Sequence, residues 1–308
     1  MAEGFTQHGN DAWAATQASE LADFLARHPK TLVLTGAGLS TASGIPDYRD
    51  RDGVRRGNEP IQGPAFRASS AVQRRYWARS MVGWPVLARA CPNAGHEALA
   101  ALEDLGLIGS LLTQNVDGLH QQAGSRAVLE LHGNIHSVIC LGCGARVPRA
   151  FVQTQLVAAN PQLSSAMATP LPDGDAHLEP AAIDDFHLPA CTHCGGSLMP
   201  DVIFFGDNLP AARTDRALAQ MEAADALLVV GSSLMVYSGF RFCRLAAAAG
   251  KPIAAVNLGR TRADDLISLK IEASAERLLP RVAYSLTRLL HANTAPMPIG
   301  LIQQRGVS

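Results

Sequence analysis

Residues Thr31-Leu32-Val33-Leu34-Thr35-Gly36-Ala37-Gly38 decide the fold class of this 308-residue chain. A continuous apolar run that enters a glycine turn is typical of a buried parallel strand at the start of an α/β unit. An amphipathic helix is expected just before it, over residues 17–28. The glycines let backbone N–H groups approach a pyrophosphate, which makes the turn a candidate nucleotide site. Alone it is weak evidence, because position 41 is Thr and no acidic residue ends a following strand about 20 residues on.

The strand-then-helix pattern recurs along the chain. Strands are expected at residues 107–113, 202–205, 226–230 and 252–256, and helices at 94–105, 211–223 and 238–249. Strands that alternate with helices indicate an α/β fold with a doubly wound parallel sheet. Residues 51–92 are polar, rich in arginine and aromatic-bearing, and they predict a helical excursion from this sheet.

Two Cys-x-x-Cys pairs, Cys140 with Cys143 and Cys191 with Cys194, bracket a separate module. Four thiolates in two such pairs fit a tetrahedral structural zinc site that leaves no ligand position open for catalysis. A redox site needs only one such pair, and His193 is expected to be a bystander beside four thiolates. Residues 144–190, between the inner cysteines, include a Pro- and Asp-rich stretch and predict a long exposed insertion.

The composition indicates a globular protein of enzyme size. A formal net charge of −1 gives no electrostatic reason to expect nucleic acid or a membrane surface as a partner. No apolar run reaches the roughly 20 residues of a transmembrane helix, and the N-terminus lacks the features of a signal or transit peptide. Cys91 and Cys243 are isolated, which favours a reducing compartment. We therefore expect a cytoplasmic protein, and the excess of arginine over lysine is compatible with a bacterial source.

Ligands bind at the carboxyl ends of the strands in doubly wound sheets, and several of these ends carry polar residues. Gln114, Asn115 and Asp117 follow one strand, and His132 stands further on. An amide, a carboxylate and a histidine can orient a polar ring and take a proton near neutral pH. His120, in the same stretch, is expected to cap or to pack. Other strand ends carry the polar groups of Gly231-Ser232-Ser233 and Asn257, so the ends together favour a dinucleotide.

In their order along the chain, these phrases resemble those of the sirtuins, the NAD-dependent protein-lysine deacylases. The matching phrases are Gly36-Ala37-Gly38-Leu39-Ser40, Ser43-Gly44-Ile45-Pro46-Asp47-Tyr48-Arg49, Gln114-Asn115-Val116-Asp117, His132-Gly133, the four cysteines, Phe204-Phe205-Gly206, Gly231-Ser232-Ser233 and Asn257-Leu258. Tyr48, the wording of residues 76–79 and 236–239 and the long insertion look closest to the class II branch of the fourth mammalian sirtuin. Val116, Asp207 and Ser232 are conservative departures from the usual Ile, Glu and Thr.

The resemblance implies a Rossmann-like domain and a smaller zinc-binding domain, with NAD and acyl-lysine meeting in the cleft between them. The NAD-binding domain is expected to comprise residues 18–50, 93–138 and 199–290. A helical insertion is expected at 51–92, the zinc-binding module at 139–198 and a tail at 291–308.

The resemblance also implies a role for each matched position. NAD is expected to contact Gly36, Ala37, Gly38, Asp47, Tyr48, Arg49, Gln114, Asn115, Asp117, Gly231, Ser232, Ser233, Asn257, Leu258, Gly259 and Ala275. The substrate peptide is expected to add a strand at Val202, Phe204, Phe205 and Gly206. His132, with Asn115 and Asp117, forms the implied catalytic group, in which His132 removes a proton from a ribose hydroxyl. The implied products are free lysine, nicotinamide and O-acyl-ADP-ribose.

The acyl group that the enzyme removes is left open by the sequence. Tyr76 and Arg79 are spaced i, i+3 and share one face of a helix, and a Tyr-x-x-Arg pair in this segment marks sirtuins that prefer acidic acyl chains. The alternative is a solvated arginine on an arginine-rich helix. Trp77 and Trp84 could instead shape a wide apolar channel for longer chains.

Other functions are weighed beside deacylation. Within the same family, mono-ADP-ribosyl transfer is an alternative. A zinc-ribbon binding module is a different class, and the near-neutral charge argues against nucleic acid as its ligand. An NAD oxidoreductase would reduce nicotinamide on turnover instead of releasing it.

Overall fold

The computed structural model describes residues 3–56, 59–163, 170–171, 175–176, 178 and 183–294, and its central feature is a six-stranded parallel sheet. The strands are β1 (Thr31–Thr35), β2 (Ile108–Thr113), β3 (Val128–Glu130), β9 (Leu227–Val230), β10 (Ile253–Val256) and β11 (Leu269–Ile271). Their order across the sheet is β11-β10-β9-β1-β2-β3, and every neighbouring pair is parallel. The predicted doubly wound sheet is confirmed.

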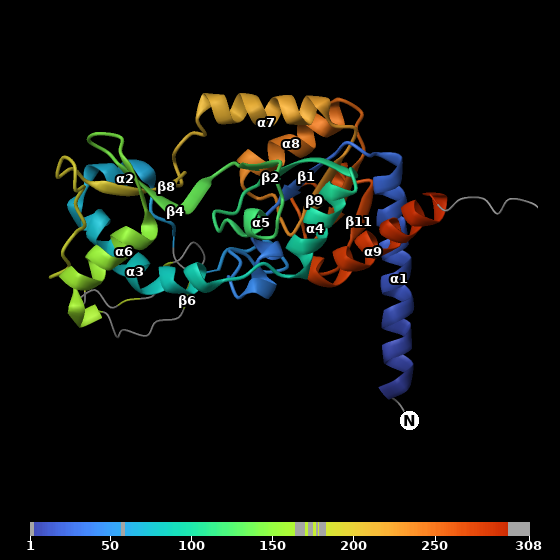
Figure 1. Ribbon diagram of the computed structural model, residues 1–308, viewed down its shortest axis with the longest axis horizontal. Coiled ribbons are helices and arrows are strands. Elements are labelled where there is room, and N and C mark those ends of the chain that lie inside the picture. Colours follow the sequence, from blue (N-terminus) through green and yellow to red (C-terminus); the bar gives the residue numbers. More distant parts are fainter. Residues whose placement is uncertain are drawn as a thin grey trace, which may run out of the picture.

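Helices cover both faces of this sheet (Figure 1). One face packs against α1 (Glu3–Arg27), α4 (Ala94–Asp104) and α9 (Ala275–Thr294), and the other against α7 (Ala211–Ala223) and α8 (Tyr237–Ala248). Side chains of β1 alternate between the two cores, with Val33 in the first and Leu32 and Leu34 in the second. All five residues of β1 are buried, so its apolar run is continuous because both faces are covered.

The registers of β1, β2 and β9 bring their carboxyl ends to one edge of the sheet. Thr35, the last residue of β1, is the register partner of Thr113 in β2 and of Val230 in β9. The chain after β1 forms two short 3-10 turns, η1 (Ala37–Leu39) and η2 (Thr41–Ser43). The polar residues that follow these three strands therefore meet at one place.

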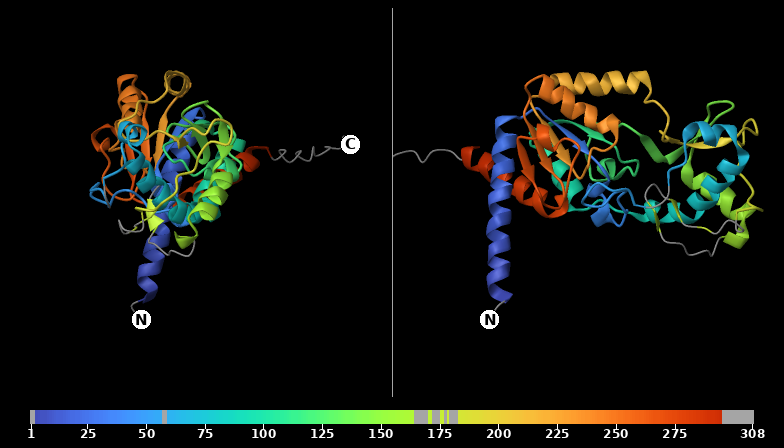
Figure 2. Two further views of the ribbon diagram at one scale, coloured as in Figure 1. Left: turned by 90° about the vertical axis from the view of Figure 1, so that its left-hand side faces the viewer. Right: turned by 180° about the vertical axis from the view of Figure 1, so that it is seen from behind.

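A smaller lobe is built on a three-stranded antiparallel sheet. Its strands are β4 (Gly133–Cys140), β5 (Arg146–Pro148) and β8 (Leu198–Val202), in the order β5-β4-β8. Helices α2 (Gly63–Ala68), α3 (Ser70–Arg89) and α6 (Arg149–Ala159) share one apolar core with this sheet. The lobe lies at one end of the molecule, and α1 projects from the body at the other (Figure 2). Strands β4 and β8 cross the predicted module bounds at 139 and 198. The predicted domain bounds stay predictions.

The prediction of a long exposed insertion at 144–190 is wrong for α6. Arg149 is fully buried on this helix, with its guanidinium over the rings of Trp77 (5.2 Å) and Trp84 (4.8 Å) of α3. It donates to Ser80 Oγ at 3.2 Å and to Gln153 Oε1 at 2.8 Å. Val152 and Leu156 face the same core. This part of the insertion therefore joins the zinc-type module to the helical excursion.

Two further predictions need correction. Residues 202–205 do not form a strand of the parallel sheet, because β8 ends at Val202 and pairs antiparallel with β4. Their apolar character has another cause, since Phe204 packs against Phe66 and Tyr76 in the small lobe. The expected helical excursion over 51–92 begins only at Gly63 with α2, because Asp50 instead caps a turn through the N–H groups of Asp52 and Val54.

Several short elements complete the described structure. They are α5 (Leu119–Gln122), η3 (Pro161–Leu163), β6 (Pro170–Leu171), β7 (Asp175–Ala176) and η6 (Asp264–Leu266). No helix in the described part of the chain combines the length and apolar character of a membrane span. Most of the predicted tail, residues 295–308, lies outside the described residues.

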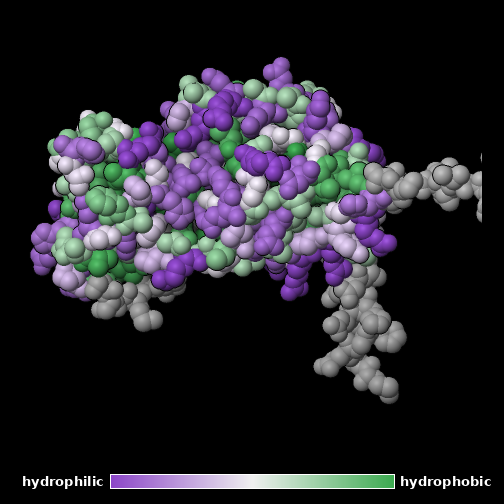
Figure 3. All heavy atoms as spheres, in the orientation of Figure 1, coloured by the Kyte–Doolittle hydropathy of each residue, from purple (hydrophilic) through white to green (hydrophobic). Residues whose placement is uncertain are grey.

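The face of the molecule in Figure 3 mixes hydrophilic and apolar side chains over both lobes. Among the exposed large apolar residues are Phe151 and Val157 of α6 and Leu289 of α9. Scattered exposed apolar residues are normal for a globular protein.

Candidate active site

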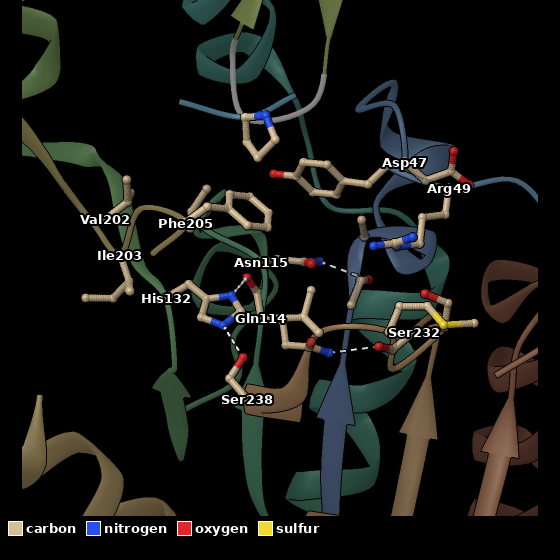
Figure 4. A pocket seen from close by; sticks show the side chains of 18 of the residues that line it. Asp47, Arg49, Gln114, Asn115, His132, Val202, Ile203, Phe205, Ser232 and Ser238 are labelled. Atoms are coloured by element: carbon tan, nitrogen blue, oxygen red, sulfur yellow. Dashed lines mark hydrogen bonds between the residues drawn. The ribbon is translucent and has the colours of Figure 1, made fainter. Parts of the chain in front are cut away.

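A cavity of about 900 Å³ lies where the two lobes meet. The strand ends of the large sheet line it with Gly36, Asn115 and Ser232, and the small lobe lines it with Tyr76 and Val202. Its volume is in the upper part of the range for small-molecule and cofactor sites, about 300–1,000 Å³. Figure 4 shows side chains from both lobes directed into it.

The side chain of Asn115 is held in one orientation at the floor of the cavity. Its amide nitrogen donates to the Gly36 carbonyl at 3.2 Å and to Ser40 Oγ at 3.1 Å. Ser40 in turn donates to Asp117 Oδ2 at 2.7 Å, and the N–H of Leu119 donates to Asp117 Oδ1 at 3.0 Å. Because both amide hydrogens are used, Asn115 Oδ1 is the atom left to accept a hydrogen bond from a ligand.

Gln114 links the ends of three parallel strands. Its side-chain nitrogen donates to the Thr35 carbonyl at 3.2 Å and to Ser232 Oγ at 2.8 Å, as Figure 4 shows for the second bond. Its backbone N–H also donates to the Thr35 carbonyl, at 3.0 Å. Hydrogen bonds within the chain therefore hold the polar residues at the floor of the cavity in place.

His132 lines the cavity, and one of its ring nitrogens carries no hydrogen. Its Nδ1 lies 2.9 Å from the Gln114 carbonyl and its Nε2 lies 2.8 Å from Ser238 Oγ (Figure 4). A carbonyl can only accept, so Nδ1 carries the hydrogen and Nε2 accepts from the Ser238 hydroxyl when the ring is neutral. Burial lowers the pKa of His132, the Gln114 carbonyl opposes this and the charge of Arg213 adds to it. The neutral ring is thus favoured, and Nε2 is equipped to take a proton.

The loop after β1 suits a diphosphate. A Cβ at Gly38 would lie 2.9 Å from the Gly231 carbonyl oxygen, so this approach of the β1 and β9 loops requires glycine. Arg49 and Arg55 line the same side of the cavity. Arg55 Nε is buried without a hydrogen-bond partner in the described part of the chain, and burial followed by the charge of Arg49 lowers the pKa of Arg55. A bound anion would satisfy both features, so these residues fit the diphosphate of a dinucleotide.

The segment after β8 forms the opposite wall. Ile203 N–H donates to the His132 carbonyl at 2.7 Å, and Phe205 forms an isolated parallel bridge with Gln62. Gly206 ends this segment with a φ of +81°.

 Gly133, which pairs with Val202 at the end of β8, has a φ of +84°. Both values lie in the left-handed region that favours glycine.

Tyr76 and Arg79 lie on one face of α3 and both line the cavity. The ring centroid of Tyr76 lies 5.4 Å from that of Phe204 and 5.4 Å from that of Phe66. Arg79 donates from Nε to the Ala176 carbonyl at 2.9 Å, which ties β7 of the insertion to the cavity wall. The solvated alternative for Arg79 therefore does not describe its position, whereas its role toward an acyl group stays a prediction.

The four predicted cysteines come together in the small lobe. Their sulfur atoms all lie within 4.8 Å of one another, with Cys140 and Cys194 at 3.5 Å and Cys143 and Cys191 at 3.8 Å. Four thiolates at about 2.3 Å from one zinc ion have sulfurs roughly 3.8 Å apart in a tetrahedron. The geometry and the all-thiolate chemistry fit structural zinc. Backbone N–H groups, that of Cys143 first, lower the pKa of the Cys140 thiol and favour the thiolate that a metal needs.

Comparisons with known proteins agree with this geometry. The Sir2 family model matches residues 36–238. The chain belongs to the Sir2 family. An NAD-dependent protein deacetylase of Xanthomonas campestris pv. campestris (strain 8004) is 56% identical over 259 residues, which cover 84% of this chain and 88% of that protein. NAD-dependent protein deacetylase 2 of Bradyrhizobium diazoefficiens is 54% identical over 259 residues, covering 84% and 95%.

Solved Sir2 structures share the fold of this Sir2-family chain. A Sir2 structure with a p53 peptide and NAD+ has a TM-score of 0.68 and 31% identity, and the match covers 86% of this chain and 97% of that one. Sir2Tm bound to a propionylated peptide has a TM-score of 0.68 and 31% identity, covering 87% and 97%.

The cavity of this Sir2-family chain brings together most of the predicted ligand-binding residues. Those that line it are Gly36, Ala37, Gly38, Asp47, Tyr48, Arg49, Gln114, Asn115, Asp117, His132, Val202, Phe204, Phe205, Gly206, Gly231, Ser232, Ser233, Asn257 and Leu258. Gly259 and Ala275 are not among the lining residues. Gly259 instead approaches the backbone of Arg51, and Ala275 is buried at the start of α9.

Three residues of this site were missed by sequence reasoning. Ser40 orients Asn115 and Asp117, Ser238 bonds to His132, and Arg55 lines the cavity with its Nε buried. Ser40 and Ser238 both lie in phrases that carry the Sir2 resemblance, which was the available signal. Their hydrogen bonds reach 77 and 106 positions along the chain, so spacing alone could not reveal them.

Proposed function

We propose that this protein is an NAD-dependent protein-lysine deacetylase that transfers the acyl group from lysine to ADP-ribose and releases nicotinamide. The observation that carries the proposal is His132 Nε2, which the Gln114 carbonyl keeps free of a hydrogen by fixing the tautomer, in the lining of a cavity large enough for a dinucleotide. The relatives named NAD-dependent protein deacetylase support it. When bound, NAD supplies the ADP-ribose that accepts the acyl group, and nicotinamide leaves.

The large sheet supplies the NAD site. Arg49 and Arg55 would face the diphosphate, and Ser232 and Asn257 would face the ribose and adenine end. The amide oxygen of Asn115 would accept from the nicotinamide carboxamide, because its nitrogen is already engaged. Preorganised donors and acceptors of this kind place the leaving group without reorganisation during the reaction.

His132 would act as the general base. Its Nε2 accepts a proton from a ribose hydroxyl, and the Gln114 carbonyl stabilises the charged ring through Nδ1–H. Ser238 occupies Nε2 in the free protein and would yield this position to the substrate hydroxyl. The chain therefore contributes positioning and one proton transfer.

The acyl-lysine peptide would lie beside Val202, Phe204 and Gly206 as an added strand. In this mode main-chain hydrogen bonds give affinity with little dependence on sequence. Tyr76 and Arg79 would meet the acyl group, because both line the cavity wall that the small lobe contributes. Sir2Tm, whose solved structure is similar to this chain, is bound to a propionylated peptide, which supports an acyl site that takes more than acetyl.

The test is to incubate the protein with NAD and an acetyl-lysine peptide and to follow nicotinamide and the peptide mass together. The proposal predicts that nicotinamide is released only when acetylated peptide is present, and that the peptide loses one acetyl mass per nicotinamide. An unchanged peptide with ADP-ribose attached to protein would identify an ADP-ribosyltransferase. Formation of reduced nicotinamide would identify an oxidoreductase. The unacetylated peptide is the matched control.

A further inference from the structure

Two buried histidines lie behind the cavity floor and take no part in the site described above. His96 is in the first turn of α4 and His120 is in α5, and both are at most 1% exposed. Their ring centroids are 5.0 Å apart. Neither lines the cavity, so a role in the reaction would have to act through other residues.

Hydrogen bonding fixes the tautomer of His96. The backbone N–H of Asn93 donates to His96 Nδ1 at 3.3 Å, so Nδ1 is bare and Nε2 carries the hydrogen of the neutral ring. The side chain of Asn93 donates to the Leu39 carbonyl at 2.8 Å and to Ser43 Oγ at 2.9 Å. His96 is therefore connected, through Asn93, to the η1–η2 loop beside the cavity.

His120 begins a second chain of hydrogen bonds. Its Nε2 lies 2.9 Å from Thr35 Oγ1, and Thr35 donates its hydroxyl hydrogen to Thr113 Oγ1 at 2.8 Å. With the Thr35 hydrogen directed to Thr113, His120 Nε2 donates to Thr35 Oγ1 and His120 Nδ1 carries no hydrogen. Thr113 Oγ1 also accepts from the backbone N–H of Asn115 at 3.1 Å. This series of hydrogen bonds ends at Asn115, which would contact nicotinamide in the proposed function.

The two ring nitrogens that remain are complementary. His96 Nε2 carries a hydrogen and His120 Nδ1 a lone pair, and neither nitrogen has a hydrogen-bond partner in the described part of the chain. Burial lowers the pKa of His96 to about 4, with Asp117 opposing, and the pKa of His120 to about 3, with His96 adding to the effect. Both rings are thus kept neutral.

We propose that His96 and His120 are positioning residues. Both rings are neutral and in the Nε2–H tautomer, and their hydrogen bonds hold Asn115 and the η1–η2 loop in the positions that nicotinamide binding needs. This rests on the proposed function for the identity of the ligand. The pair joins the two sides of the nicotinamide end through Thr113 and Asn93, and no atom of either ring needs to reach the cavity.

The direct test is the ¹⁵N–¹H long-range NMR spectrum of histidine-labelled protein without ligand at pH 6, where an unperturbed histidine is mostly protonated. The His96→Asn and His120→Gln variants assign the signals of the two rings. Both rings are expected to be neutral and in the Nε2–H form. A protonated ring, or the Nδ1–H form at His120, overturns the proposal. This measurement needs neither NAD nor peptide, so it stands even if the deacetylase assignment fails.

The functional arm compares His120→Gln with His120→Leu by calorimetric NAD titration and by steady-state kinetics. Glutamine can place an N–H near the position of His120 Nε2 and leucine cannot, so only leucine breaks the bond to Thr35. His120→Leu is expected to weaken NAD binding or raise KM for NAD by about 10-fold, the cost of a lost buried hydrogen bond, with KM for the peptide unchanged. His120→Gln is expected to recover most of this loss. Equal losses in both variants, or equal losses toward NAD and peptide, would indicate a packing role and overturn the positioning claim.

Discussion

His132 Nδ1 lies 2.9 Å from the carbonyl oxygen of Gln114, although 18 positions separate the two residues. Gln114 directly follows β2 and His132 directly precedes β4, so the contact joins the large sheet to the small lobe. The bond fixes the ring tautomer and turns Nε2 toward the cavity. The position of this proposed base therefore depends on the junction between the two lobes.

Replacing His132 by Ala should slow turnover by roughly 100- to 10,000-fold, the usual range for a lost general base. NAD binding should largely survive, because Arg49, Asn115 and Ser232 are unaffected. Steady-state rates and a calorimetric NAD titration check both parts. Ser238→Ala is the matched control and should keep most of the rate, since Nε2 stays bare without its hydroxyl partner. A His132→Ala protein that deacetylates at the parent rate would show that another group is the base.

The acidic limb of the pH–rate profile should lie below pH 6.5, which is the ordinary pKa of a histidine side chain. Burial lowers the pKa of His132, the hydrogen bond to the Gln114 carbonyl opposes this, and the charge of Arg213 lowers the pKa further. The neutral base therefore persists as the pH falls and is lost only below that lowered pKa. Arg213→Gln removes the charge that lowers the pKa of His132 and should move the limb toward higher pH. The profile of kcat/KM measures it, and a limb at or above 6.5 in the parent protein would contradict the assignment.

The protein should contain one zinc ion per chain, measurable by elemental analysis. Cys140→Ser should lose the ion and unfold the small lobe, because metal binding at such a site is part of the folding free energy. Cys91→Ser is the control, since Cys91 is exposed and lies outside the cluster. Metal-free protein that is fully folded and active would refute structural zinc.

Arg79→Met tests the acyl preference. If Arg79 binds the carboxylate of an acidic acyl chain, losing that charged hydrogen bond costs about 1.5–3 kcal/mol, or roughly 10- to 150-fold in kcat/KM. The loss should appear on succinyl-lysine peptides and be small on acetyl-lysine. Arg75→Met, an exposed arginine on the same helix, should change neither. Equal losses on both peptides would assign Arg79 to folding, through its bond to Ala176.

Local patterns were enough to predict the large sheet and the metal cluster. The apolar run of β1, the helix over 211–223 and the two Cys-x-x-Cys pairs each depend on near neighbours in the chain, and the structure confirms them. The closeness to the class II branch stays a prediction.

Contacts between distant segments could not be predicted in the same way. Arg149 appeared to belong to an exposed insertion, yet it lies between two tryptophans that are more than 60 positions earlier. Residues 202–205 have the apolar character of a parallel strand, but their side chains fill the small lobe and the cavity wall. β3 and β11 are three residues each and too short to stand out by periodicity.

The fate of the acetyl group tests the central claim most directly. A peptide with a ¹³C-labelled acetyl-lysine is incubated with NAD and the protein, and the products are separated and weighed by mass spectrometry. The account predicts that the label leaves the peptide on ADP-ribose as O-acetyl-ADP-ribose, in equal amount to the nicotinamide released, and that His132→Ala abolishes most of it. Label recovered as free acetate without consumption of NAD would contradict the account.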